Sequence, residues 1–404
     1  MKPKRYFSIV VVMLVLTNFY NCGSAFAAEQ DRITVSYYRW DPYEKGPTDY
    51  PTTLEFASSE EPRMVNGRVL IPLRKLAEYF NYKVDYLPES KKIELADDLG
   101  KTMELTLGQK QTTVNGRQVL LDVPADAVNG VTFVPLRFIA ENFDLYVDWQ
   151  ASTQTVRIFE YTLSTREYIL DLRTRSLMRR GNPGEPNQLL ADLADQSGDW
   201  ERLTMNVIKT AQGNDILMII NGHGEPPCLT DIHYFYFVRG KMVTQSLVKD
   251  SLLMYKPFDG LSDDGARVIL GDGKTATVYD DLTTQVIAKY DLQELCANAS
   301  SGVPIWYENN IYDIEGYGGY YLLLRGSYNC LHLVVYLDSG QVDVVYKTVF
   351  TPDEQKYFEL GYADGPMGAD VVQLQFEGER DGVLVFSCDL DNHGDYIEHL
   401  YKLK

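Results

Sequence analysis

The chain has 404 residues and a formal net charge of −19, with 45% hydrophobic residues and 38 Lys and Arg against 57 Asp and Glu. This length suits two domains better than one core, and the composition excludes a mainly disordered or fibrous chain. The acidic balance argues against a nucleic-acid partner, because such proteins present Lys and Arg to phosphates.

Residues 1–27 have the pattern of a secretory signal peptide. Three basic residues among the first five positions precede an apolar run at 6–20, and Ala25 and Ala27 supply the small residues of a cleavage site. A membrane anchor would need roughly 20 apolar residues, and Asn18 interrupts this run. We therefore expect a secreted protein with cleavage after Ala27 and without a stable membrane anchor.

An internal repeat with an offset of 63 residues defines the next part of the chain. Ile71–Arg74 aligns with Val134–Arg137, and the match continues on both sides. Pro72 and Pro135 stand where a helix would begin, a position whose N–H has no intrahelical partner. Apolar residues then follow at the spacing of a one-sided helix: Leu73, Leu76, Ala77 and Phe80 in the first copy, and Leu136, Ile139, Ala140 and Phe143 in the second.

Each copy therefore predicts a strand, a helix and a strand-turn-strand, which gives an α+β N-terminal domain of two β-α-β-β repeats. Between the copies, Asn115-Gly116 is the strongest short signal for a hairpin turn. Arg74 and Arg137, at the two helix starts, are candidate ligand contacts. We favour the structural interpretation, in which each arginine bridges to its own sheet.

Residues of about 63–159 resemble a known family, the copper amine oxidase N-terminal domain-like or "stalk" domain of secreted proteins from Gram-positive bacteria. The resemblance rests on three segments: Val114-Asn115-Gly116, Asn129-Gly130 leading into Phe133–Glu141, and Val147-Asp148-Trp149. It implies a surface-displayed spacer or wall-associated module without catalytic residues. The oxidase itself needs copper-binding histidines in a His-x-His pattern, which this sequence lacks, so amine oxidation is rejected.

From Tyr161 to Lys404 the chain is predicted to be mostly all-β. Short aromatic and β-branched runs alternate with Gly, Asp and Asn turns. Five such turns recur, as expected for a β-propeller of five or six blades, with a β-sandwich or another twisted sheet as the alternative. Helices are expected at 352–360, opened by a capping box at Thr351–Glu354, and at 188–194.

Catalytic motifs are missing from this second part, since it has no G-x-S-x-G elbow and no H-E-x-x-H helix. Asp389, Asp391 and Asp395 form an acidic loop that resembles calcium-binding loops, although His393 and Leu400 stand where oxygen ligands are expected. A solvated turn is the simpler interpretation. No cofactor other than calcium is expected.

Cysteines and aromatic residues leave two further questions. The mature chain keeps Cys228, Cys296, Cys330 and Cys388, which form either two disulfides or four buried thiols. Aromatic clusters could stack on sugars, but alternating aromatics in strands more often fill cores. The clusters are Tyr234–Phe237, Trp306-Tyr307 and Tyr317–Tyr321.

Together these observations predict four segments: a signal peptide at 1–27, an extension at 28–62, a stalk domain at 63–160 and a β-rich, propeller-like domain at 161–404. We expect a secreted, cell-envelope-associated, non-catalytic protein whose C-terminal part binds an unidentified cell-wall or extracellular ligand. The alternative is a secreted hydrolase that acts on polysaccharide or peptide through carboxylates of the C-terminal part. Converging carboxylates in a deep pocket would favour the hydrolase.

Overall fold

The computed structural model describes ten stretches of the chain and the single residue 200: residues 32–41, 46–181, 185–194, 202–223, 229–251, 258–297, 311–327, 330–363, 374–389 and 396–404. The predicted signal peptide lies outside these residues. No helix among the described residues is long and apolar enough to cross a membrane.

The chain divides into two compact units, Met1–Ser197 and Gly198–Lys404. This division comes later than Tyr161, where the sequence suggests a domain boundary. It assigns the four-stranded sheet that follows Tyr161 to the first unit, and the reason is a buried ion cluster described below. The boundary at Tyr161 itself remains a prediction.

Unit 1 contains four small sheets. Their strand orders are β13-β14-β1-β2 with β3 on β1, β10-β9-β8-β7-β6, β11-β12-β5-β4, and β15-β16-β17-β18. The strands are β1 (Thr34–Asp41), β2 (Gly46–Pro47), β3 (Thr52–Thr53), β4 (Arg63–Val65), β5 (Arg68–Pro72), β6 (Lys83–Leu87), β7 (Lys92–Ala96), β8 (Thr102–Thr106), β9 (Gln111–Val114), β10 (Arg117–Leu120), β11 (Asp126–Val128), β12 (Val131–Pro135), β13 (Tyr146–Gln150), β14 (Thr155–Glu160), β15 (Thr162–Ser164), β16 (Tyr168–Asp171), β17 (Ser176–Arg179) and β18 (Gln188–Asp192).

The two repeats meet along β5 and β12, which pair antiparallel. Ile71 is opposite Val134, its own counterpart in the repeat. Leu70 is opposite Pro135, and Pro72 is opposite Phe133. Because equivalent residues face each other, the two copies are related by a local two-fold axis through the Ile71–Val134 pair. The sequence repeat is therefore also a repeat in space.

Asn-Gly turns close the hairpins of this unit. Asn115 and Gly116 both have positive φ, 48° and 85°, and the flanking Val114 and Arg117 pair directly. A two-residue loop with φ > 0 at both positions is the turn that fits strand twist. The predicted turn is confirmed, and Asn66-Gly67 and Asn129-Gly130 have the same signs of φ.

The two repeat helices, α2 (Leu73–Phe80) and α3 (Leu136–Asn142), begin one residue later than predicted. Pro72 and Pro135 are their N-cap residues, with ψ of 119° and 108°. The proline ring fixes φ at a value that suits an extended strand as well as a helix, so each proline ends its strand. The predicted apolar stripes are confirmed, because Leu73, Leu76 and Ala77, and likewise Leu136, Ile139 and Ala140, are buried.

Unit 2 contains four antiparallel sheets in chain order, β19-β20-β21-β22, β23-β24-β25, β26-β27-β28-β29 and β30-β31-β32. The strands are β19 (Arg202–Lys209), β20 (Asp215–His223), β21 (Leu229–Val238), β22 (Lys241–Ser251), β23 (Arg267–Gly271), β24 (Thr275–Asp280), β25 (Val286–Asp291), β26 (Tyr312–Tyr317), β27 (Tyr321–Gly326), β28 (His332–Tyr336), β29 (Val342–Val344), β30 (Gln375–Arg380), β31 (Val383–Cys388) and β32 (Ile397–Lys402). Three helices accompany them, α4 (Leu292–Ala297), α5 (Val345–Val349) and α6 (Pro352–Ala363).

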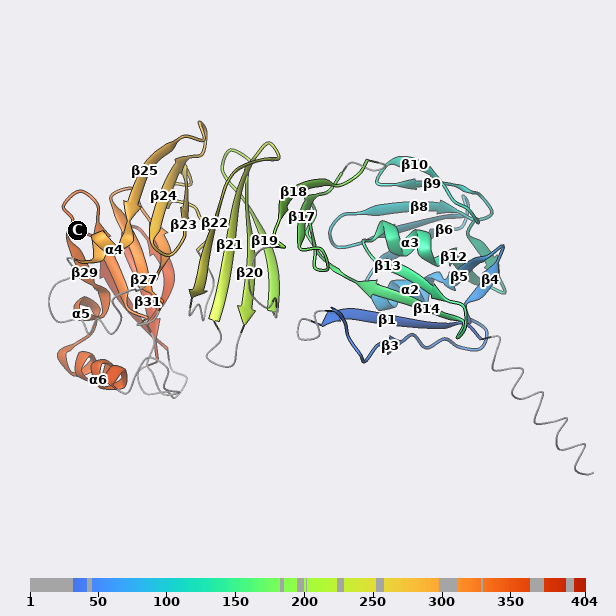
Figure 1. Cartoon of the computed structure of the whole chain (residues 1–404), viewed down its shortest axis with the longest axis horizontal. Coiled ribbons are helices and arrows are strands. Elements are labelled where there is room, and N and C mark those ends of the chain that lie inside the picture. Colours follow the sequence, from blue (N-terminus) through green and yellow to red (C-terminus); the bar gives the residue numbers. More distant parts are fainter. Residues whose placement is uncertain are drawn as a thin grey trace, which may run out of the picture. The chain divides into compact units, whose positions relative to one another are not determined.

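Successive sheets of unit 2 pack face to face (Figure 1). Met218 and Tyr236 of the first sheet share a core with Val268 and Tyr279 of the second. A larger core joins the second, third and fourth sheets. Central strands such as β27 and β28 are buried on both faces, which explains their almost continuous apolar sequence.

The described chain is mostly β, as expected for its C-terminal part. The α+β class predicted for the N-terminal domain is not confirmed, since two short helices accompany many strands there. The helix predicted at 188–194 is wrong: Gln188–Asp192 is β18, paired with β17. Pairing with an open sheet edge outweighs the weak helical propensity of this segment. The capping box of α6 is confirmed, because the Thr351 N–H donates to Glu354 Oε2 at 2.7 Å.

Four of the five predicted turns join adjacent strands of one sheet, at Asp171–Arg175, Val238–Lys241, Asp281–Gln285 and Asp338–Gln341. The fifth, at Asp391–Asp395, lies outside the described residues. A propeller additionally requires closure of the sheets around an axis, and this part of the expectation remains a prediction.

Candidate functional site

A row of charged side chains crosses the third sheet of unit 2. Asp313 on β26 pairs with Arg325 on β27, and Arg325 pairs with His332 on β28. Cross-strand partners point to the same face of a sheet. The three residues are only 5%, 3% and 3% exposed, so charged groups occupy one row of an otherwise apolar interior.

Glu315 completes this group, which we call the charge row: Asp313, Glu315, Arg325 and His332. Glu315 lies two residues after Asp313, at a register shift between Ile314 and Gly316, and its carboxylate contacts the same row. Glu315 Oε1 lies 3.3 Å from Arg325 Nε, and Glu315 Oε2 lies 2.8 Å from His332 Nε2. Each positive group of the row therefore has a carboxylate partner.

The two carboxylates of the charge row differ in their pKa. Burial raises the pKa of Asp313, and this effect outweighs Arg325, whose guanidinium donates to Asp313 Oδ2 at 3.1 Å. Burial would also raise the pKa of Glu315, but the charges of His332 and Arg325 outweigh it and hold that pKa below its usual range. Glu315 is therefore the firmly ionised member of the row.

Asp313 also connects neighbouring sheets. Its Oδ2 accepts hydrogen bonds from Ser251 Oγ at 2.7 Å and from Ser327 Oγ at 3.0 Å. Ser251 ends β22 of the first sheet. The charge row is thus tied to the packing between sheets, and disrupting it would disturb more than one strand.

A cavity of about 720 Å³ adjoins the charge row. This volume lies within the range of small-molecule sites. Its lining includes Glu315, Arg325 and His332 and four further carboxylates, those of Asp259, Asp263, Glu377 and Glu379. Because Arg325 is already paired with carboxylates of the row, the remaining lining charge is strongly negative. We call this space the acidic cavity.

Two groups at the acidic cavity have special environments. Burial, with a further contribution from the charge of Glu379, raises the pKa of Asp263, although Tyr321 Oη donates to this carboxylate at 2.7 Å. His332 Nδ1 is buried and makes no hydrogen bond to any described residue.

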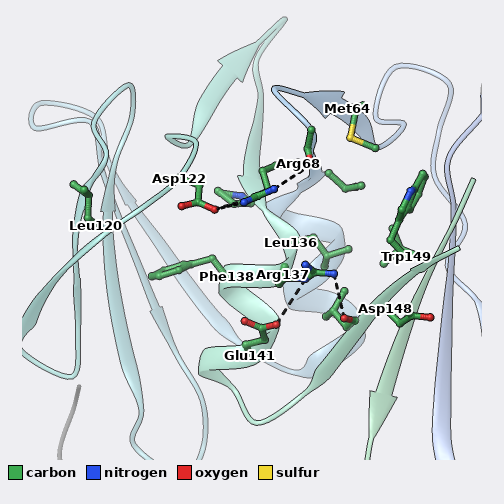
Figure 2. A pocket seen from close by; sticks show the side chains of 15 residues that line it. Met64, Arg68, Leu120, Asp122, Leu136, Arg137, Phe138, Glu141, Asp148 and Trp149 are labelled. Atoms are coloured by element: carbon green, nitrogen blue, oxygen red, sulfur yellow. Dashed lines mark hydrogen bonds and ion pairs between the residues drawn. The ribbon is translucent and has the colours of Figure 1, made fainter. Parts of the chain in front are cut away.

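A second pocket, of about 340 Å³, lies in unit 1 between the repeats. Figure 2 shows Met64 and Trp149 on one side of it and Leu120 on the other. Arg68 donates to Asp122 Oδ2 from two nitrogens, at 2.9 and 2.6 Å. The pocket opening is therefore lined partly by apolar side chains, and its charged neighbours Arg68 and Asp122 are paired with each other.

Arg137 lines the same pocket and contacts its own domain (Figure 2). Its Nη2 donates to the Val147 carbonyl of β13 at 3.4 Å, and its Nε lies 3.7 Å from Glu141 Oε1. These contacts bear out the interpretation of Arg137 as a bridge from the helix start to its own sheet. Arg74 is exposed at the start of α2.

A third cavity, of about 730 Å³, lies in unit 1 and is mainly basic. Lys101, Arg166, Arg179 and Arg180 contribute to its lining, against two glutamates. Behind it, Asp144 Oδ2 lies 2.6 Å from Lys101 Nζ and 2.8 Å from Arg180 Nη2. We call these three residues the Asp144 cluster.

The Asp144 cluster explains the unit boundary. Asp144 follows α3, Lys101 precedes β8, and Arg180 follows β17, so three elements meet at one carboxylate. Ser164 of β15 donates to it as well, at 3.2 Å. Burial would raise the pKa of Asp144, but Arg180 and Lys101 outweigh it and lower that pKa. The sheet β15–β18 is thereby fastened to the repeats.

The calcium prediction falls largely outside the described residues. Asp391 and Asp395 are not among them, whereas Asp389 follows β31. The calcium site therefore remains a prediction. Neither the charge row nor the acidic cavity was found from the sequence, although charged residues within buried apolar strands, such as Arg325 in Tyr321–Gly326, are the signal that could have indicated them.

Three of the four cysteines are buried thiols, and most described residues of the aromatic clusters lie in the core. Cys296, Cys330 and Cys388 are free and buried, which leaves no two-disulfide arrangement in this structure. Burial raises the pKa of the Cys296 thiol to about 12. The residues of Tyr234–Phe237 are buried in the core, as are Tyr317 and Tyr321, whereas Tyr320 is 43% exposed. Cys228 and Trp306-Tyr307 lie outside the described residues.

Comparison with known proteins recognises one part of the chain. Residues 52–158 match the family model of the copper amine oxidase N-terminal domain, which confirms the resemblance read from the repeat. The C-terminal part is not recognised by a family model. A search of curated proteins finds no match.

Several solved structures are similar at low identity. The WD40 domain of SCAP from fission yeast is 11% identical with a TM-score of 0.23, over 85% of this chain and 64% of that one. A puromycin-hydrolyzing peptidase from Mycobacterium tuberculosis is 10% identical with a TM-score of 0.27, over 80% and 45%. The β-propeller domain of Cps50 from Myceliophteria thermophila is 8% identical with a TM-score of 0.26, over 80% and 97%. The chain therefore covers less than two thirds of the length of the first two of these structures.

Proposed function

We propose that this protein is a secreted, envelope-associated and non-catalytic binding protein of a Gram-positive bacterium. In this proposal the repeat-containing domain is the accessory module that displays a β-rich, propeller-like part, and the ligand binds in the acidic cavity of unit 2. The observation that carries the proposal is the composition of that cavity: a charge row with internal partners, beside four more carboxylates.

The charge of the cavity selects the class of ligand. Five lining carboxylates face two positive residues, and Arg325 is held by Asp313 and Glu315. A ligand with ammonium groups would neutralise the surplus. His332 lies at this cavity with its Nε2 2.8 Å from Glu315 Oε2.

A competition between matched ligands tests this proposal. The mature full-length chain is titrated calorimetrically with a short oligolysine and with its fully acetylated form, which has the same length but no ammonium groups. The oligolysine should bind and the acetylated form should not. Binding should weaken as salt is added, because salt screens exposed charges.

Variants locate the binding site. Replacing both rim carboxylates, Glu377→Gln with Glu379→Gln, should weaken oligolysine binding at least tenfold. The matched control is Glu398→Gln on strand β32 of the same sheet, an exposed carboxylate paired with Arg380, which should change the affinity less than twofold. Equal effects of the two variants would show that attraction to the whole acidic protein, and not this cavity, explains binding.

Secretion and attachment need a separate test. The mature N-terminus should begin at Ala28, as read by N-terminal sequencing of protein from the culture medium or the cell-wall fraction. A chain that keeps residues 1–27 and stays in the cytoplasm would contradict this part of the proposal.

One observation favours a hydrolase as the second candidate. Two carboxylates of the acidic cavity have their pKa values moved apart, with Asp263 raised and Glu315 lowered. Glycosidases and other acid/base catalysts use such pairs. Release of reducing ends or amines from cell-wall material, abolished by both Asp263→Asn and Glu315→Gln, would favour the hydrolase over the binding protein.

A further inference from the structure

We propose that His223, Asp231 and Asp250 form a binding site for a divalent transition metal of the zinc class, separate from the acidic cavity and from the predicted calcium loop. The three residues each offer one ligand atom, and these atoms lie within 4.8 Å of one another. His223 Nε2 lies 3.3 Å from Asp231 Oδ1 and 3.8 Å from Asp250 Oδ1.

Three adjacent strands bring these residues together. His223 ends β20, Asp231 is near the start of β21, and Asp250 is near the end of β22. Asp231 pairs with Asn221, two residues before His223. Side chains two residues apart on a strand point to the same face, so His223 and Asp231 lie diagonally on one face at the end of the sheet.

A bulge directs Asp250 to the same place. The register of β21 and β22 shifts between Thr230 and Ile232, opposite Asp250. Asp250 has a φ of 53°, a left-handed conformation that aspartate tolerates better than most residues. Asp231 Oδ1 accepts the backbone N–H of Asp250 at 2.9 Å, which fixes this bulge. The sheet thus holds the third carboxylate in position.

Two of the three spacings between ligand atoms are close to those around a tetrahedral ion. Zinc lies about 2.0–2.2 Å from nitrogen and oxygen ligands, and tetrahedral angles then place those ligands roughly 3.3–3.5 Å from one another. The two distances from His223 Nε2, 3.3 and 3.8 Å, need only a small adjustment to meet this requirement. Three protein ligands leave a fourth position for water or a ligand group.

Charge and ligand type point to the same class of metal. Two carboxylates beside one imidazole leave a surplus of negative charge, which a divalent cation neutralises. Calcium takes 6–8 oxygen ligands, and a site with one nitrogen and two carboxylates does not supply them. Imidazole with carboxylate suits zinc and its transition-metal neighbours instead.

Titration of metal into the chelator-treated mature chain tests the site. Zinc should bind with a stoichiometry of one and raise the melting temperature, while calcium under the same conditions should not compete for this site. His223→Ala and Asp250→Asn should each weaken zinc binding by more than roughly 100-fold, since even partners one shell further out are worth about 10- to 100-fold. Asp353→Asn, an exposed carboxylate at the start of α6, is the control and should leave the affinity unchanged.

Cobalt supplies a readout that does not depend on stability. Cobalt bound to one nitrogen and two oxygens should give visible bands without the near-ultraviolet thiolate absorption that Cys296, Cys330 or Cys388 would produce. The side chain of Asp250 is half exposed. Loss of the cobalt bands in Asp250→Asn, with an unchanged circular dichroism spectrum, supports the site. Absence of zinc binding by the wild-type chain, equal binding by His223→Ala, or a thiolate spectrum overturns it.

Discussion

The two units each hold an ion cluster beside a cavity of almost the same volume, about 730 Å³ in unit 1 and 720 Å³ in unit 2, yet the clusters differ in composition. In unit 1 one carboxylate, Asp144, faces two cations. In unit 2 two carboxylates of the charge row share one arginine and one histidine. The positive surplus of the Asp144 cluster lies beside a mainly basic cavity, whereas the balanced charge row lies beside a cavity with four further carboxylates.

This difference teaches that a chain with a net charge of −19 does not distribute its charge evenly. The Asp144 cluster uses its ions to fasten a sheet to the repeats, and its carboxylate is fully used by partners. The charge row leaves His332 Nδ1 without a partner. The first arrangement fits a structural joint, and the acidic cavity beside the second is where we propose that a ligand binds.

Removing the arginine of the charge row should give the largest effect. Arg325→Leu leaves Asp313 and Glu315 without their shared cation, and breaking a buried ion pair on one side costs about 3–5 kcal/mol of unfolding free energy. Urea unfolding should show this loss, and hydrogen exchange should locate it in peptides of unit 2 only. Arg380→Leu, which removes an exposed pair with Glu398, should cost less than about 1 kcal/mol. Equal losses of unfolding free energy in Arg325→Leu and Arg380→Leu would contradict the distinction between the buried and the exposed ion pair.

Removing Asp144 should give a similar but smaller effect in unit 1. Asp144→Asn leaves Lys101 and Arg180 close together without their carboxylate, at a cost of about 3 kcal/mol, the lower end of the range for buried pairs. Faster hydrogen exchange should appear in β15–β18 and in the residues around Lys101. Protection of β15–β18 that remains at the wild-type level would mean that another contact fastens this sheet.

Acid should separate the Asp144 cluster from the acidic cavity. The pKa of Asp144 is lowered in the folded chain, so its contribution is present above the unfolded value of about 3.9 and is lost as the pH falls through the folded value. The stability difference between wild type and Asp144→Asn should therefore shrink below about pH 4. The pKa of Asp263 is raised in the folded chain, so uptake of a proton by this carboxyl favours the folded state. Acidification should therefore stabilise the wild type relative to Asp263→Asn, which is the opposite of the effect at Asp144. Both differences are read from urea unfolding across pH.

The smallest effect is expected at the pocket between the repeats. Arg137→Gln removes an ion pair with Glu141 in which both side chains are about half exposed, 51% and 53%, and such pairs contribute about 0–1 kcal/mol. Thermal unfolding should shift by no more than a few degrees. A larger shift would show that the hydrogen bond from Arg137 to the Val147 carbonyl supports β13 more than its 3.4 Å length suggests.

Much of unit 1 could be predicted because its signals are local. Asn115-Gly116 forces φ > 0 at two neighbouring positions, so the turn is encoded within four residues. The stripe Leu73, Leu76 and Ala77 follows from helical geometry alone. The repeat predicted two copies of one unit, but not that Ile71 would face Val134, because the sequence does not say how two copies pack.

The helix predicted at 188–194 failed for the opposite reason. Nothing within Gln188–Asp192 requires an extended strand, and the open edge of β17 supplies the hydrogen bonds that decide its conformation. The candidate sites depend on such distant partners as well. His223, Asp231 and Asp250 converge through strand pairing and a bulge, and residues 12 positions apart in the chain, Asp313 and Arg325, become neighbours only in the sheet.

The sequence by itself determined the β-rich composition, the repeat, its Asn-Gly turns and the family resemblance of residues 52–158, because each of these depends on residue types at short spacing. Tertiary structure alone decided which charges are buried and which share a cavity. The reason is that burial and charge pairing arise between strands that are distant in the chain. An aspartate is therefore a solvated turn residue at one position and a buried partner of arginine at another.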